Sequence, residues 1–238
     1  MTDLPNTMLG ALLTGPEQIE IREFTLERPE PGEIILAVRA ATTCGTDVKV
    51  FKRGGHPRML QTPTLFGHEM AGTIAAAGKD VSGFKEGDNV VVANSVPCQT
   101  CDYCLCEREN LCKNLKYLNG AFAEYIRVPE SFVKYNTYNL SPGLSFAKAA
   151  LTEPLACVLN GMDACELSEY TCNGPTEVIV FGGGPIGLLF VAALAAEDHH
   201  VILADPNQHR LDAGIAMGAK EAIMIQRGGN QAEKVKKL

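Results

Sequence analysis

The sequence lacks the features that would tie it to a membrane or a nucleic acid. No apolar run reaches the roughly 20 residues that a membrane span needs, and the start has neither the basic nor the apolar segment of a signal peptide. The sequence also has no internal repeats and no low-complexity segments. It has no excess of basic charge, because the formal net charge is -7. These absences predict a cytoplasmic protein with no membrane and no nucleic-acid partner.

The composition is that of a globular protein with a substantial core. The chain has 238 residues, of which 46% are hydrophobic and 21% charged, enough for one large or two ordinary domains. It has nine cysteines, and an odd number in a reducing compartment does not indicate a disulfide framework. Five of the nine lie between residues 98 and 112, a density that indicates a bound metal.

Up to about residue 135 the sequence predicts short strands separated by turns. Apolar residues alternate with others over residues 34–40, 70–76 and 122–128, and three valines follow a turn signal at residue 90. Glycine and proline separate these segments. Short strands at this spacing favour a partly closed β-barrel.

From about residue 144 the pattern changes to helices and then to alternating elements. We predict strands at 177–181, 200–204 and 221–226, with helices at 186–197 and 207–217 between them. This βαβαβ order implies an α/β fold with a parallel sheet and right-handed crossovers. Residues 231–238 are predicted to begin another helix. The predicted domains are therefore 1–160 and 161–238.

Four cysteines with regular spacing form a candidate metal lobe at residues 98–112. Thiolates at this density suit a closed, tetrahedral zinc site that stabilises a loop and leaves no position for chemistry. An iron–sulfur cluster and a redox pair are alternatives, but the flanking strands favour zinc. Cys106 is interpreted as a bystander. The predicted ligands of this structural zinc are Cys98, Cys101, Cys104 and Cys112.

A second set of metal-ligating residues is dispersed along the chain. Cys44 follows directly from a predicted strand, His68 and Glu69 open another, and Glu153 starts a helical stretch. Taken singly, each has an ordinary interpretation as a buried thiol or a satisfied polar contact. Strand ends, however, can direct such side chains into a cleft.

Residues 182–187, Gly-Gly-Gly-Pro-Ile-Gly, follow a predicted strand and open a predicted helix, which is the context of a dinucleotide-binding loop. Gly182 permits the tight turn, Gly184 lets the backbone approach a pyrophosphate, and Gly187 allows close packing of helix and strand. Pro185 and Ile186 start the helix, whose N-terminus favours anions.

Asp205 ends the second strand of this unit, where a carboxylate binds ribose hydroxyls and disfavours a 2′-phosphate. This favours NAD over NADP. Arg210, which could bind a phosphate, weakens the preference, and Asp205 could instead cap the next helix.

Together these motifs resemble the zinc-containing medium-chain dehydrogenases. The similar segments are Cys44-Gly-Thr-Asp, Gly67-His-Glu, the cysteine lobe, Glu153-Pro-Leu-Ala and the glycine loop. Glutamate at 153 resembles the sorbitol, L-iditol and L-threonine dehydrogenase branch. The resemblance implies a GroES-like catalytic domain followed by a Rossmann domain, and a dimer or tetramer in the full-length form. It also implies catalytic zinc held by Cys44, His68 and Glu69, with Glu153 a ligand or hydrogen-bonded to metal-bound water.

The implied reaction is hydride transfer from a secondary alcohol or polyol to NAD, with L-threonine as the alternative substrate. Zinc with an open position lowers the pKa of a bound alcohol, and Thr46 could carry the proton away. Thr46 could equally be a simple turn residue. Many relatives continue the proton path with a histidine where this chain has Lys49. The loop 51–61, with His56 and Arg58, could form the rim of the pocket, although His56 is interpreted as solvent-facing.

A complete Rossmann sheet has six strands, and we predict three here. The chain is therefore expected to be a fragment that binds two zinc ions, holds NAD poorly and turns over little substrate. An alternative of another class is an inactive or non-catalytic protein that binds zinc and a dinucleotide.

Overall fold

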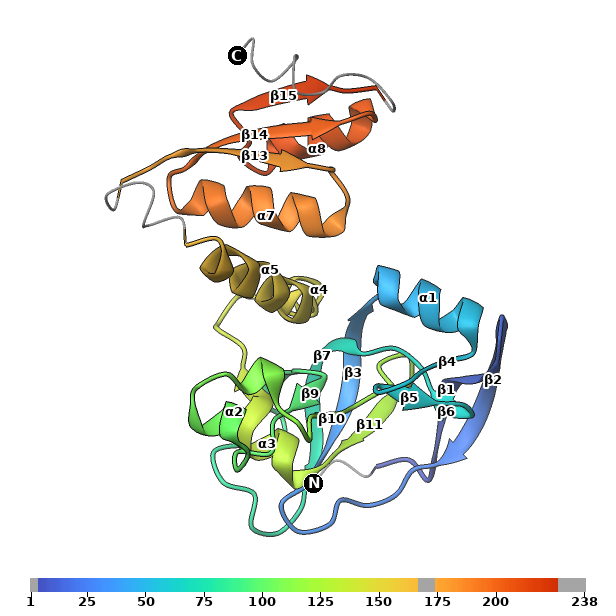
Figure 1. Ribbon diagram of the computed structural model, residues 1–238. Helices are drawn as coiled ribbons and strands as arrows, with labels where there is room; N and C mark the ends of the chain where they lie inside the picture. Colours follow the sequence, from blue (N-terminus) through green and yellow to red (C-terminus); the bar gives the residue numbers. More distant parts are fainter. Residues whose placement is uncertain (1–3, 167–173, 227–238) are drawn as a thin grey trace. The chain divides into compact units, whose positions relative to one another are not determined.

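The computed structural model describes residues 4–166 and 174–226 and divides the chain into two compact units (Figure 1). The first unit comprises residues 1–153 and the second residues 154–238. The sequence analysis placed the domain boundary after residue 160. In the described part of the chain, no helix combines the length and the apolar character that crossing a membrane requires.

The first unit is built around a five-stranded antiparallel sheet in the order β11-β3-β7-β8-β12. The alternating segments at 34–40 and 70–76 form its central pair of strands. Ile34 and Leu36 are buried on one face of the sheet, and Ile35 is buried in a separate cluster on the other face. Both faces are therefore covered. The strands are β3 (Ile34–Thr42), β7 (Glu69–Ala77), β8 (Asn89–Val92), β11 (Tyr125–Val128) and β12 (Thr137–Asn139).

A second sheet, in the order β2-β1-β6, continues the first and gives the predicted barrel-like arrangement. Its strands are β1 (Thr7–Gly15), β2 (Gln18–Thr25) and β6 (Thr64–Leu65). A bridge between Gly10 and Ala123 joins β1 to the segment before β11, and the Ala11 N–H donates to the Phe122 carbonyl. The predicted strand at 122–128 is accordingly regular only from Tyr125, because residues 122–124 form this junction.

Two small hairpins and several helices complete the first unit. The loop predicted at 51–61 is partly ordered: it holds the end of helix α1 and the hairpin of β4 and β5. The remaining elements are α1 (Gly45–Arg53), β4 (Gly55–His56), β5 (Leu60–Gln61), β9 (Ser95–Val96), α2 (Asp102–Leu105), the 3-10 helix η1 (Glu109–Leu111), β10 (Lys116–Tyr117), α3 (Glu130–Asn136) and α4 (Phe146–Ala149). Helix α5 (Thr152–Ala164) runs across the division between the units.

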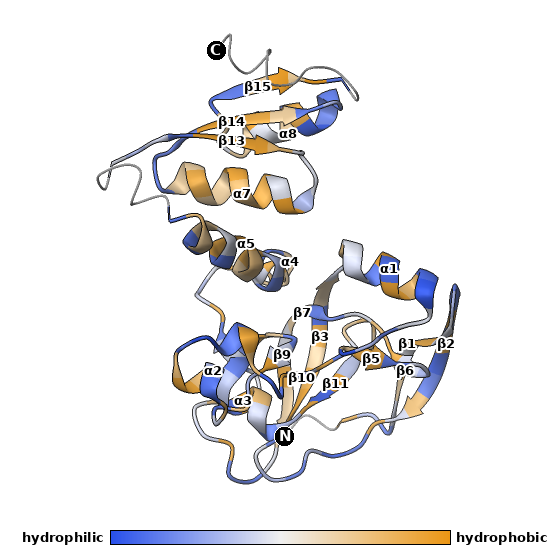
Figure 2. Cartoon of the chain, in the orientation of Figure 1, coloured by the Kyte–Doolittle hydropathy of each residue, from blue (hydrophilic) through white to orange (hydrophobic). Residues whose placement is uncertain are grey.

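The second unit has the predicted βαβαβ order and a parallel sheet β13-β14-β15. Its elements are β13 (Glu177–Phe181), α7 (Pro185–Ala196), β14 (His200–Asp205), α8 (Gln208–Ala216) and β15 (Glu221–Met224). Helix α7 is apolar along its length (Figure 2), and it contributes Val191 and Leu194 to a core with Val201 and Leu203 of β14. The helix predicted at 231–238 lies outside the described residues.

Candidate functional site

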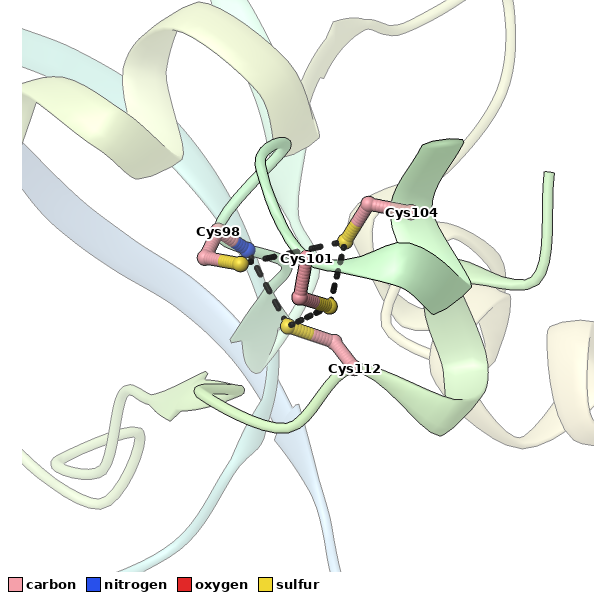
Figure 3. A group of neighbouring side chains, drawn as sticks. All are labelled: Cys98, Cys101, Cys104 and Cys112. Carbon is pink, nitrogen blue, oxygen red and sulfur yellow. Dashed lines mark hydrogen bonds between the residues drawn. The ribbon is translucent and has the colours of Figure 1, made fainter. Parts of the chain in front are cut away.

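The cysteine lobe is closed at its neck by a short pair of strands. β9 and β10 pair antiparallel, Ser95 with Tyr117 and Val96 with Lys116, so the chain leaves and re-enters the domain at one place. Between them, Cys101 precedes α2, Cys104 lies within it, and Cys112 follows η1. The four predicted ligands point toward one another (Figure 3).

The spacing of the sulfur atoms matches a tetrahedral ion. The Sγ of Cys104 lies 4.0 Å from that of Cys98 and 3.6 Å from that of Cys101, and the Cys101 and Cys112 sulfurs are 3.9 Å apart. Four thiolates at about 2.3 Å from one zinc ion would lie about 3.8 Å apart. The backbone N–H of Cys98 donates to the Cys112 sulfur at 3.2 Å, which favours a thiolate there. The donor set fits zinc.

The thiols of the lobe differ in acidity without a metal. Hydrogen bonds from Thr100 lower the pKa of Cys98, whereas burial raises the pKa of Cys104. Cys106 is exposed at the end of α2 and is not among the four grouped cysteines. Its position supports the interpretation of a bystander.

Cys44 lies at the N-terminus of helix α1, two residues after β3 ends. Its sulfur accepts the backbone N–H of Thr46 at 3.2 Å, and the Cys44 N–H donates to the Asp47 carboxylate at 3.0 Å. This reciprocal cap fixes the thiol at the positive end of the helix dipole, where a thiolate is favoured. Thr46 itself lies in the first turn of the helix and is partly buried.

His68 connects Cys44 to Asp47 through its two ring nitrogens. Its Nε2 lies 3.4 Å from the Cys44 sulfur, and its Nδ1 lies 2.9 Å from Asp47 Oδ1. A zinc ion shared by a thiolate and an imidazole would place these two ligand atoms about 3.5 Å apart. Burial lowers the pKa of His68, but hydrogen bonds and charge from Asp47 and Cys44 outweigh it and raise that pKa to about 10. A metal ion here would have to displace that proton, because histidine binds a metal as the neutral imidazole.

Glu69 carries a buried oxygen atom with no partner. Its side chain is 2% exposed; the Thr42 hydroxyl donates to Oε2, but Oε1 has no hydrogen-bond partner. Leaving a buried carboxylate oxygen unpaired costs free energy unless a cation meets it. This orphaned oxygen is the strongest local sign that the cluster is built for a metal.

Glu153 joins this cluster from the first turn of α5. The pKa of Glu153 is raised above its ordinary value. Burial is the largest cause, the positive charge of His68 opposes it, and the negative charges of Glu69 and Asp47 add to it. Ligand atoms of His68, Glu69 and Glu153 lie within 4.8 Å of one another, as do those of Cys44, Asp47 and His68. His68 is common to both groups. The structure thus places predicted ligands on both sides of the imidazole, but Cys44 and Glu69 share neither group, so the predicted set of Cys44, His68 and Glu69 is not gathered within 4.8 Å.

The glycine loop has a different requirement at each glycine. Gly182 has φ +101°, in the left-handed region. A Cβ on Gly187 would lie 1.8 Å from the Gly182 carbonyl oxygen, so only glycine fits there. A Cβ on Gly184 would meet no protein atom within 4 Å, although Gly184 caps α7 directly before Pro185. That space at a helix N-terminus is where a phosphate could approach the backbone.

Asp205 is 1% exposed and its carboxylate is engaged within the loop. Oδ2 accepts the Gly183 N–H at 2.7 Å, Oδ1 accepts the Asn207 N–H at 2.8 Å, and Arg210 approaches Oδ2 at 3.6 Å. Burial raises the pKa of Asp205, but these backbone bonds and Arg210 bring it below its ordinary value. The carboxylate therefore holds the glycine loop in place.

Two residues of the site were not predicted from the sequence. Asp47 orients His68, and Thr42 binds Glu69. The signal for Asp47 was local: it stands three residues after Cys44, the spacing of a capping box. No local sequence signal pointed to Thr42, because its contact with Glu69 arises from the pairing of two strands. His56, interpreted from the sequence as a solvent-facing residue of the loop 51–61, is instead partly buried, and its Nδ1 accepts backbone N–H groups from Arg58 and Met59.

Comparison with known proteins agrees with this geometry. Residues 30–136 match the alcohol dehydrogenase GroES-like domain. The chain is 39% identical over 210 residues to D-altritol 5-dehydrogenase of Agrobacterium fabrum, a match that covers 83% of this chain and 60% of that protein. It is 33% identical over 224 residues to L-threonine 3-dehydrogenase of Bacillus subtilis, covering 92% and 59%. An alcohol dehydrogenase of Escherichia coli CFT073 solved with NADH superposes with a TM-score of 0.81 at 28% identity, covering 98% of this chain and 67% of that one.

These matches point to one class: residues 30–136 match the GroES-like domain of the alcohol dehydrogenases, and the chain is similar to dehydrogenases of that family. Within that family it is similar to the polyol and L-threonine dehydrogenases, as the glutamate at 153 predicted. The chain spans about 60% of the length of the curated relatives it matches.

Proposed function

We propose that this chain carries the catalytic domain and part of the nucleotide-binding domain of a zinc-dependent dehydrogenase that oxidises a secondary alcohol or polyol with NAD. The domains proposed are residues 1–160 and 161–238. The observation that carries the proposal is the 3.4 Å approach of Cys44 Sγ to His68 Nε2 beside Glu69, whose buried Oε1 has no partner.

The proposed catalytic zinc would be held by Cys44, His68 and Glu69, with Glu153 as a ligand or a hydrogen-bond partner beside it. When bound with an open position, zinc acts as a Lewis acid toward an alcohol oxygen. Asp47 holds the His68 ring so that Nε2 faces Cys44. Thr46 is proposed to pass the substrate proton toward solvent through its hydroxyl. A structural zinc in the cysteine lobe would hold that loop folded.

The proposed dinucleotide site is the N-terminus of α7. Gly184 gives the phosphates access to backbone N–H groups there, and Gly182 and Gly187 shape the turn. NAD is preferred over NADP because the buried negative charge of Asp205, whose two oxygens already accept backbone N–H groups, would repel a 2′-phosphate. Arg210, whose side chain is 54% exposed, is the residue that would accept a 2′-phosphate if NADP also binds.

Metal content tests the proposal directly. We expect two zinc ions per chain by elemental analysis, and one in His68→Ala, because the cysteine lobe keeps its own ion. His56→Ala is the matched control and keeps both. A single zinc ion in the unmodified chain, unaffected by His68→Ala, would refute a catalytic zinc centre.

Turnover is measured as NADH formation with a panel of sugar alcohols and L-threonine. The assay uses this chain and the same chain completed with the part of a polyol dehydrogenase that the match leaves uncovered. We expect activity in the completed protein, lost when a chelator removes zinc, and little in the chain alone. Equal rates in both would contradict the expectation that the chain alone turns over little substrate. Two bound zinc ions without turnover in either form would favour a non-catalytic zinc- and dinucleotide-binding protein.

A further inference from the structure

The strand β2 leaves one backbone edge unpaired. It lies at the end of the sheet β2-β1-β6 (Figure 1), and in the part of the chain that the structure describes no strand pairs with its outer side. It is eight residues long and contains no proline and no lysine, although Glu20, Arg22 and Glu23 place charge along it. Such charges disfavour most partner strands, so a partner of this edge must match them.

The hydrogen-bond pattern shows which residues face outward. The Leu26 N–H donates to the Asn6 carbonyl, so the even-numbered residues of β2 bond to β1 in the observed register. In β1, the N–H and C=O groups of the odd-numbered residues point away from β2, since the Ala11 N–H donates to the Phe122 carbonyl. The N–H and C=O groups of Ile19, Ile21 and Glu23 therefore point away from the sheet.

The side chains of β2 are complementary to a second copy of β2. If two copies pair antiparallel about Ile21, each Ile21 meets its equivalent, and Glu20 lies opposite Arg22 of the second copy. The two-fold axis repeats the contact, giving two opposite-charge pairs on one face. Within one chain the pair already exists, with Arg22 and Glu20 2.6 Å apart on the same face.

The opposite face of β2 adds apolar surface to this pairing. Ile21 is 69% exposed and Ile19 is 42% exposed, and Leu9 of β1, on the same face, is 49% exposed. Ile21 contributes both an outward N–H and C=O and an exposed side chain at the centre of the proposed contact. Backbone bonding, the Glu20–Arg22 pairs and the burial of Ile21 agree on this register, in which Glu23 lies opposite Ile19 of the second copy.

We propose that β2 is a self-association edge at which two copies of this chain pair antiparallel about Ile21, extending the sheet across a two-fold axis. The contact is separate from the metal centre and from the dinucleotide loop. Failure of the proposed enzymatic function would therefore leave it standing.

A charge-exchange experiment tests the register. Sedimentation velocity on the unmodified chain is expected to show a concentration-dependent dimer. Arg22→Glu places two carboxylates opposite each other in both cross-strand pairs, and Glu20→Arg places two guanidinium groups opposite each other. Each variant alone should dimerise about tenfold or more weakly, because two attractive cross-strand pairs become repulsive. An equimolar mixture of the two variants should form heterodimers, since every cross-strand pair is then opposite in charge.

Two further variants separate this contact from other causes. Lys79→Glu makes the same charge change at an exposed position of this domain and should leave the dimer intact. Ile21→Pro removes an outward N–H without breaking a bond to β1 and should abolish dimers, whereas Ile21→Val should keep them. A chain that stays monomeric at every concentration overturns the proposal and leaves the edge to another partner. Unchanged dimers in Ile21→Pro, or no heterodimer in the mixture, also overturn it.

Discussion

Gly187 and Gly184 allow the roles of fold and ligand in the glycine loop to be separated. At Gly187, an added Cβ would lie 1.8 Å from the Gly182 carbonyl oxygen, a backbone atom that can move only with the whole turn. At Gly184, the φ of -74° and ψ of 178° are ordinary for any residue, and the added Cβ meets no protein atom within 4 Å. We therefore expect opposite effects from the same methyl group.

Gly187→Ala should destabilise the second unit by about 3 kcal/mol, the upper end of the range for overpacking, because the clash is with backbone. For a domain of this size, that lowers the melting temperature by about 12–24 °C. Gly184→Ala should change stability by less than about 1 kcal/mol, since alanine restricts the unfolded chain but caps the helix less well than glycine.

Thermal unfolding by circular dichroism and NAD titration by calorimetry measure the two effects. Gly184→Ala should bind NAD about tenfold or more weakly while unfolding close to the unmodified temperature, because its methyl group occupies the space proposed for the phosphates. Gly187→Ala with unchanged stability would refute the packing argument. Gly184→Ala with unchanged NAD affinity would refute the proposed phosphate position.

Three further predictions concern the metal centres and the loop. Cys104→Ser should remove one zinc ion per chain and unfold the lobe at lower temperature, whereas Cys106→Ser should keep both ions; elemental analysis and calorimetry distinguish them. Asp47→Asn should weaken zinc binding at the second centre by about 10–100-fold in competition with a chelator, because His68 loses its orienting carboxylate. The pKa of Asp205 is lower in the folded protein than in the unfolded chain. Its stabilisation is therefore present above about pH 4 and is lost as the pH falls through the lowered value. Asp205→Asn should remove this pH dependence from the free energy of unfolding, measured by urea unfolding at a series of pH values. An unchanged pH dependence would contradict the stabilising role of the Asp205 carboxylate.

The second unit could be predicted almost completely from the sequence. The predicted strand at 177–181 has the bounds observed for β13, and the predicted helices α7 and α8 each differ from the observed ones by one residue at either end. β13, α7 and β14 are separate apolar segments, and α8 begins just after Pro206 and ends just before Gly218, so local signals were sufficient for these elements.

The first unit was predicted less well, because several of its elements have no burial periodicity. In β1, Leu12 and Leu13 are both buried on successive positions, and nearly every residue of β2 is exposed. Burial alternates in neither strand, although Gln18-Ile19-Glu20-Ile21-Arg22 alternates polar and apolar residues in the sequence, a signal that was available for β2. Helix α1 was also missed, since only Asp47 and Val50 are buried in it. Its cap at Cys44 and the left-handed Gly54 at its end were the signals available.

The assembly of the metal centre depends on strand register, which the sequence does not state. Thr42 of β3 pairs directly with Glu69 of β7. Cys44 therefore follows the end of one strand at the place where His68 precedes the start of its neighbour, and the two side chains meet although they are 24 residues apart. A slip of one residue would turn Glu69 to the other face of the sheet and separate it from Thr42. The ligand types could be predicted from their motifs. The meeting of Cys44 with His68 and of Thr42 with Glu69 follows from this one pairing, whereas Asp47 is placed by the cap of α1 and Glu153 by α5.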